Sequence, residues 1–179
     1  MYRRLNILLT AVFLLFASSL AFAEGNSTGL YMGMKGVGVV FERECSEHIY
    51  NSYVLYLDSY YLATDGDKAK LGARFDFTHN KMYPLAANAE RALHFIAGAG
   101  VSAGYISDYE TATHSLCPSL AFRCGLRALY GRRMNLEIAW QADLGLTLSE
   151  ERSGEYVSSL YKDGLRHAWA PQIKIMFRF

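Results

Sequence analysis

The chain has 179 residues, of which 51% are hydrophobic and 14% aromatic, and its 18 basic and 17 acidic side chains give a net charge of +1. This composition excludes a disordered chain, because disorder requires low hydrophobicity or a high net charge. It also lacks the basic excess that nucleic-acid-binding proteins carry, so no nucleic-acid partner is expected. The length allows one domain, or a targeting segment followed by one domain.

Residues 1–23 have the pattern of a cleaved secretory signal peptide. Two positive residues, Arg3 and Arg4, precede a mostly apolar stretch from Leu5 to Ala17. The small-x-small pattern of Ala21-Phe22-Ala23 then supplies a cleavage site. The alternative is an uncleaved anchor, which the short apolar stretch disfavours. We therefore expect an exported protein whose single domain occupies residues 24–179.

The first half of that domain contains strand-like segments. Residues 28–42 alternate least clearly and include four glycines. Residues 49–62 are rich in Tyr and branched side chains, as strands are. Residues 71–78 alternate strictly between apolar and more polar positions, which is the period of a strand. Residues 79–91 include Pro84 and are predicted to form a longer connection.

The second half alternates more regularly. Residues 93–105 carry no charged side chain apart from the titratable His94, so a transmembrane helix must be considered. Three glycines on one parity disfavour a helix, and we predict a strand. The same period of two runs through residues 120–130, 134–148 and 169–179. In the last segment Ile173, Ile175, Phe177 and Phe179 share one face.

The connections also differ in length. Gly131-Arg132-Arg133 predicts a tight turn, whereas residues 107–117 and 149–166 are longer and polar. Short turns at one end and long loops at the other are typical of outer-membrane β-barrels. A possible surface ligand would bind at these two loops, although nothing in them identifies it.

The polar face of the strands carries full charges well inside the predicted elements. If the apolar face contacts lipid, these charges must pair inside a barrel, because a buried charge needs a partner. A soluble ligand-binding barrel would show the same alternation with the faces reversed. The predicted charge network of the lumen comprises Arg74, Asp76, Arg123, Arg127, Glu137, Asp143, Lys174 and Arg178.

With its aromatic residues near strand ends and its alternating C-terminal strand, the chain resembles the small eight-stranded outer-membrane barrels of the OmpA/OmpX type. It is also similar to the uncharacterised outer-membrane β-barrel proteins of Gram-negative bacteria. The resemblance implies an all-β fold, an antiparallel up-and-down transmembrane barrel. It further implies location in the outer membrane, contact with outer-membrane lipid, and recognition of the C-terminal strand, ending at Phe179, by the barrel-assembly machinery.

The number of strands needs one further step. Seven segments are clear, whereas bacterial barrels of this class have an even number of strands. We therefore split residues 28–42 into two short strands, at about 27–34 and 37–44, joined by a tight turn at Lys35-Gly36. Glycine suits such a turn because it adopts positive φ without strain. The prediction is a barrel of eight strands.

These features favour a non-enzymatic membrane barrel with a structural, adhesion or narrow-pore role. One alternative is a lipid-modifying enzyme, for which His114-Ser115 and Ser107-Asp108 would supply nucleophile, base and acid in one loop. The other is the soluble periplasmic barrel. We expect no cofactor and no metal site. Cys45, Cys117 and Cys124 are expected to be unpaired, since the latter two are too far apart on one strand to bridge.

Overall fold

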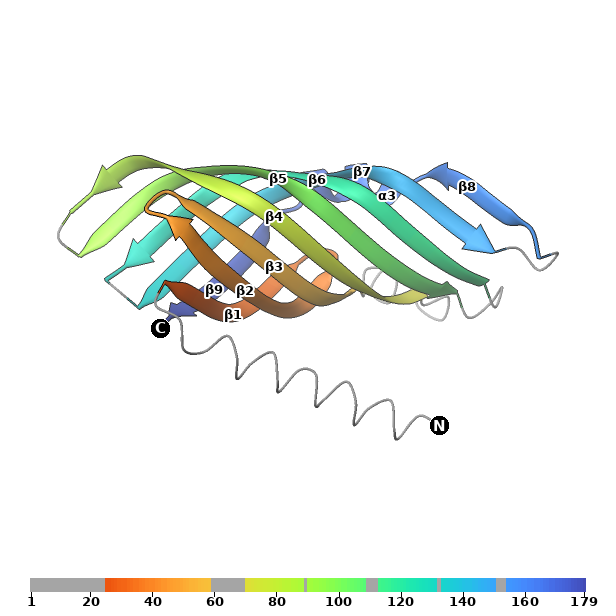
Figure 1. Ribbon diagram of the computed structural model, residues 1–179, viewed down its shortest axis with the longest axis horizontal. Helices are drawn as coiled ribbons and strands as arrows, with labels where there is room; N and C mark the ends of the chain where they lie inside the picture. Colours follow the sequence, from red (N-terminus) through yellow and green to blue (C-terminus); the bar gives the residue numbers. More distant parts are fainter. Residues whose placement is uncertain (1–24, 59–69, 89, 109–112, 132, 151–153) are drawn as a thin grey trace, which may run out of the picture.

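The structure is a computed structural model that describes residues 25–58, 70–88, 90–108, 113–131, 133–150 and 154–179. Almost all of these residues lie in β-strands, which wrap around one long axis (Figure 1). The predicted signal peptide lies outside the described residues. The elements are β1 (Asn26–Gly33), β2 (Gly36–Ser46), β3 (Ile49–Asp58), β4 (Lys70–Ala87), β5 (Arg91–Asp108), β6 (Thr113–Tyr130), β7 (Met134–Glu150), β8 (Tyr156–Leu160), α3 (Lys162–Arg166), η2 (His167–Trp169) and β9 (Gln172–Arg178).

Eight of the nine described strands close into an antiparallel barrel. The barrel strands are β1 to β7 and β9. Consecutive strands pair from β1 through β7, β7 then pairs with β9, and β9 pairs with β1. Closure satisfies the backbone groups of every barrel strand, since none is left with a free edge over its paired length. The predicted eight-stranded, up-and-down fold is confirmed.

The two-strand interpretation of residues 28–42 is also confirmed. β1 and β2 pair from Asn26↔Arg43 to Gly33↔Gly36, so the chain reverses within two residues at Met34 and Lys35. The predicted turn at Lys35-Gly36 is therefore one residue too late, and Gly36 is the first residue of β2 and does not have the positive φ expected of it. The predicted tight turn after β6 is present as well, with Gly131 at a positive φ of 58°. An L-residue with a Cβ rarely adopts that conformation, which explains the glycine.

The predicted connection at residues 79–91 is wrong. β4 continues to Ala87 and β5 begins at Arg91, so a long hairpin replaces the expected loop. Pro84 is accommodated because the register shifts between Pro84 and Ala86, and a bulge removes the need for a regular ladder hydrogen bond there.

The two predicted polar loops are largely structured. β5 and β6 extend through most of residues 107–117, which pair as far as Asp108↔Thr113. Residues 149–166 contain the end of β7, the short strand β8 paired with it, and α3. Sequence polarity was a poor guide here because these strand ends lie beyond the apolar part of the wall. Among the described residues, no helix has the length and apolar character needed to cross a membrane.

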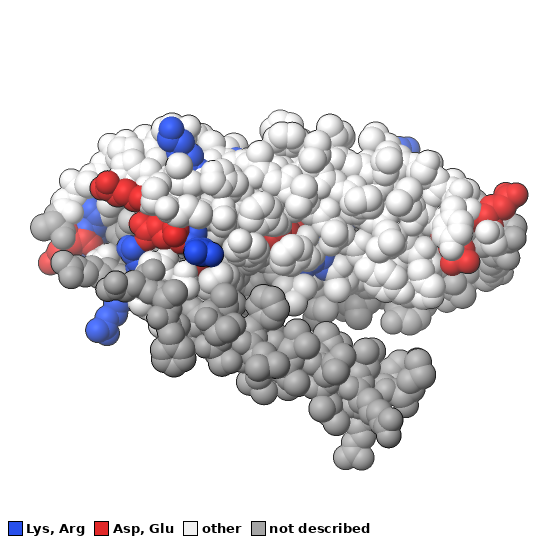
Figure 2. Space-filling model, viewed as in Figure 1, with Lys and Arg blue, Asp and Glu red and all other residues white. Residues whose placement is uncertain are grey.

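The two faces of the wall differ sharply in chemistry. Outward positions are apolar and exposed, as in β7, where Ile138, Trp140 and Leu144 are each at least 40% exposed. The neighbouring inward positions, Glu137 and Asp143, are completely buried. The face in Figure 2 is accordingly mostly uncharged, and most of its charged residues cluster towards the two ends.

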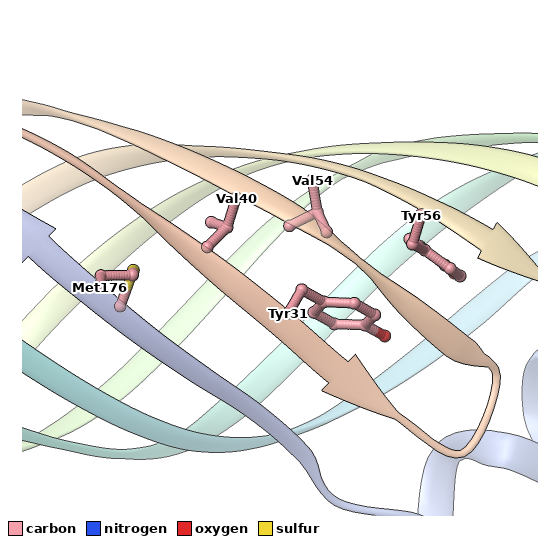
Figure 3. Packing of buried hydrophobic residues seen from close by; sticks show 5 residues of the cluster. All are labelled: Tyr31, Val40, Val54, Tyr56 and Met176. Carbon is pink, nitrogen blue, oxygen red and sulfur yellow. The ribbon is translucent and has the colours of Figure 1, made fainter. Parts of the chain in front are cut away.

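An apolar layer lies inside the barrel. It consists of Tyr31, Val40, Val54, Tyr56 and Met176, which project inward from β1, β2, β3 and β9 (Figure 3). The rings of Tyr31 and Tyr56 pack with centroids 4.8 Å apart. Along β3, this layer is flanked by Ser52 on one side and Asp58 on the other, both buried. On this side of the barrel it therefore lies between two groups of polar side chains.

Candidate functional site: the charged interior of the barrel

The first polar group lies towards the end of the barrel that holds both ends of the described chain. We call it the Glu137 cluster, and it consists of Glu42, Tyr50, Ser52, Arg123, Arg127, Glu137 and Lys174. These side chains come from β2, β3, β6, β7 and β9 because each strand turns alternate residues inward. All of them are buried.

Glu137 is the centre of this cluster. Its carboxylate forms an ion pair with Arg123 and lies 3.3 Å from both Arg127 and Lys174. It also accepts a hydrogen bond of 2.8 Å from the Tyr50 hydroxyl. Three cations and one phenol therefore converge on one carboxylate, in an interior where an unpaired charge would be costly.

Glu42 supplies the second negative charge of the cluster. It lies 2.7 Å from Arg127 and 3.4 Å from Lys174. Lys174 also donates a hydrogen bond of 2.7 Å to Ser52. Three cations thus face two carboxylates, and the cluster as a whole carries one positive charge.

The second polar group lies on the other side of the apolar layer. We call it the Asp76 cluster, and it consists of Lys35, Asp58, Arg74, Asp76, Ser102, Gln141, Asp143 and Tyr161. Two cations face three carboxylates there, which complements the excess positive charge of the Glu137 cluster.

Hydrogen bonds connect the two carboxylates at the centre of the Asp76 cluster. Gln141 donates to Asp76 and to Asp143, at 3.0 Å in both cases. Ser102 donates to Asp76 at 2.5 Å and accepts from Arg74 at 3.2 Å. The amide and hydroxyl groups therefore bridge carboxylates that would otherwise repel each other.

Two segments outside the long strands close this end of the interior. Lys35, in the β1–β2 turn, is buried and forms an ion pair with Asp143. Tyr161, between β8 and α3, accepts a hydrogen bond of 2.5 Å from Arg74, whose guanidinium lies over its ring. Burial raises the pKa of the Tyr161 phenol, so the group is neutral. Both segments fill the interior rather than line an opening.

The residues that the sequence predicted for the lumen are distributed unequally between the two clusters and the rim. Arg123, Arg127, Glu137 and Lys174 lie in the Glu137 cluster, and Arg74, Asp76 and Asp143 in the Asp76 cluster. Arg178 belongs to neither. Its side chain is 39% exposed and pairs with Glu44 at the rim, because β9 reaches the end of the barrel at that point.

Sequence reasoning missed several members of both clusters. Glu42 and Tyr50 share the inward parity of Val40 and Val54, so the alternation of β2 and β3 could have identified them. Lys35 and Tyr161 lie in a turn and in a connection, where no periodicity indicates the direction of a side chain. Their place inside the barrel could be known only from the fold.

The candidate catalytic residues are described only in part. Nδ1 of His114 lies 2.7 Å from the Tyr105 hydroxyl, and the two rings stack on the outer wall with centroids 5.7 Å apart. The Ser115 hydroxyl instead hydrogen-bonds with that of Ser149. The side chains of Ser107 and Asp108 lie outside the described set. His114 is therefore partnered with a tyrosine, and Ser107 lies opposite it in the β5–β6 register with a side chain that is not described.

The remaining candidates are readily placed. Ile173, Ile175 and Phe177 face outward on β9, which pairs with both β1 and β7 and so completes the wall. No disulfide joins the three cysteines. A cavity of about 250 Å³ opens at the rim near the chain ends, between His48, His94 and Arg127. No group of metal-ligating side chains is found among the described residues.

Comparisons with known proteins agree with this architecture. No protein-family model matches the chain, and no curated protein matches its sequence. Among solved structures, the chain is similar to a major outer membrane protein from Thermus thermophilus, with 13% identity and a TM-score of 0.51. The match covers 86% of this chain and 99% of that one. At this identity the similarity shows the fold, a closed β-barrel of the kind found in an outer membrane protein.

Proposed function

We propose that this protein is an integral outer-membrane β-barrel that serves as a structural or surface-presenting element and has no open channel. The observation that carries the proposal is the inversion of its two faces. Exposed apolar side chains cover the outer wall, while arginine, lysine, aspartate and glutamate fill the interior. A water-soluble barrel would place these groups the other way round, and large exposed apolar surfaces mark a membrane or partner contact.

Several features support the membrane as the environment. Strands β4 to β7 have 17 or 18 residues each. This is long enough for their outward side chains to cover an apolar band about 25 Å high. Closure removes free sheet edges, which hydrocarbon does not tolerate. The signal-peptide pattern of residues 1–23 provides the export that an outer-membrane location requires.

The absence of an open channel follows from the filled interior. An eight-stranded barrel has an interior about wide enough to be filled by side chains. Here the Glu137 cluster, the apolar layer around Tyr31 and the Asp76 cluster succeed each other along the axis, and Lys35 and Tyr161 close the far end. An ion would have to displace paired charges to pass.

Fractionation and gel mobility test the proposal together. The folded protein should sediment with outer membranes, resist extraction by urea or carbonate, and migrate faster on a gel when it is not boiled in detergent. In planar bilayers it should give no sustained conductance. Recovery in the soluble periplasmic fraction without a mobility shift would refute the membrane location, and a stable open channel would refute the closed interior.

A further inference from the structure

Three basic side chains lie near one another on the outer wall, and we call them the basic row: Arg43 on β2 and His79 and Lys81 on β4. All three are exposed. Arg43 pairs in register with Asn51 on β3, and Asn51 with His79, so these three positions form one line across the wall. Since strands are about 4.8 Å apart, the outer two backbones are about 10 Å apart. Lys81 follows two residues later on the same face.

Among the described residues, no ion pair neutralises the basic row. Neither Arg43 nor Lys81 has a carboxylate partner among the described residues, whereas the cations of the interior are paired. The Lys81 ammonium lies 5.3 Å from the centre of the Tyr83 ring. His79 shares a hydrogen bond of 2.7 Å with Asn51. The nearby rim carboxylate of Glu44 is already paired with Arg178.

An aromatic row borders the basic row on the side away from the chain ends. It consists of Phe41, Tyr53 and Phe77, which pair in register across the same three strands. Their ring centroids are 5.9 Å and 5.2 Å apart. Exposed aliphatic residues follow further along the wall, with Leu55 and Leu57 on β3. The wall therefore passes from basic to aromatic to aliphatic, the order of a lipid headgroup, interface and acyl chain.

On β5 and β6, the positions in register with His79 and Lys81 are uncharged. Following the register from β4 to β5 and β6, Lys81 pairs with Ala97 and then Cys124, and His79 with Ala99 and then Phe122. These outward positions carry no charge. Arg91 on β5 and Arg133 after β6 are also exposed at this end of the barrel, and they lie outside the basic row.

We infer that the basic row binds the phosphate of an anionic glycerophospholipid in the membrane leaflet next to the chain ends, with its acyl chains lying over the aromatic row. Arg43 and Lys81 supply the charge, and His79, held by Asn51, lies between them as a further hydrogen-bonding group. The inference rests on the proposed membrane location. It adds a lipid class and a defined place on the wall.

Native mass spectrometry of the folded protein tests the site. The full-length mature protein, checked by gel mobility, is released from micelles that contain phosphatidylglycerol or phosphatidylcholine, and the retained lipids are counted. Wild type should keep one phosphatidylglycerol in preference to phosphatidylcholine. Arg43→Gln combined with Lys81→Gln should weaken that retention about 30-fold, from about 1 kcal/mol per basic side chain. Each single variant should lose about fivefold.

The matched control is Arg91→Gln combined with Arg133→Gln, which removes the same charge at the same end of the barrel but outside the basic row. The control should retain the lipid as wild type does. Equal loss in both double variants, or no lipid preference in wild type, would overturn the inference while leaving the membrane location intact. A wild-type protein that fails to enter lipid and shows no mobility shift would refute the proposed function itself.

Discussion

Removal of the Glu137 charge provides a quantitative test of the interior. Among the described residues, Glu137 is the carboxylate that pairs with Arg123, whereas Arg127 and Lys174 also contact Glu42. Glu137→Gln keeps the shape of the side chain and can still accept the Tyr50 hydrogen bond. It leaves one buried guanidinium without a counter-charge, which costs about 3–5 kcal/mol.

Glu42→Gln is the internal comparison. Arg127 and Lys174, the two cations that Glu42 contacts, still contact Glu137 in this variant, so neither is left without a carboxylate. The loss of stability should therefore fall to about 1–3 kcal/mol. The measurement is reversible urea unfolding of the barrel in lipid vesicles, followed by tryptophan fluorescence and by the unboiled gel band. A Glu137→Gln variant within about 1 kcal/mol of wild type, or an equal effect of Glu42→Gln, would refute the reasoning.

Three further outcomes follow from the same geometry. Gly29→Val should destabilise the pairing of β1 with β9 by about 1–3 kcal/mol or more, since even a Cβ there would lie 1.9 Å from the Ile175 carbonyl oxygen. A Thr28→Val control should keep the unboiled gel band. A stable Gly29→Val barrel would contradict the register. Tyr161→Phe should cost about 1.5–3 kcal/mol through loss of the Arg74 hydrogen bond, seen as faster proteolysis of residues 154–171, and unchanged cleavage would show that Tyr161 does not close the interior. A water-soluble maleimide should label exposed Cys45 in vesicles but neither buried Cys117 nor lipid-facing Cys124; rapid labelling of Cys117 in the folded protein would contradict its buried position.

The strand pattern was accessible from the sequence because outward and inward positions have opposite chemistry. In β7, Leu136, Ile138 and Trp140 alternate with Asn135, Glu137 and Ala139, and this alternation located both the strand and its buried charges. The interpretation of residues 28–42 as two strands came from the need for an even number, and not from the residues alone.

Prediction from the sequence failed where the alternation of apolar and polar residues no longer indicates which way a side chain points. Pro84 suggested a break, but a bulge absorbs it within β4. The ends of β5, β6 and β7 are polar because they lie beyond the apolar part of the wall, so they resembled loops. Arg178 has the parity of an inward residue, yet it lies at the rim of the barrel, where an inward-pointing side chain is no longer buried.

The central claim is that the apolar outer wall faces lipid, and Trp140 reports on it most directly. The chain has two tryptophans, so a Trp169→Phe variant leaves Trp140, on the outer wall of β7, as the single reporter. In vesicles of phosphatidylcholine brominated along its acyl chains, its fluorescence should be blue-shifted and strongly quenched, with little quenching by aqueous acrylamide. A protein that remains in solution beside the vesicles, with Trp140 insensitive to the brominated lipid, would contradict the account.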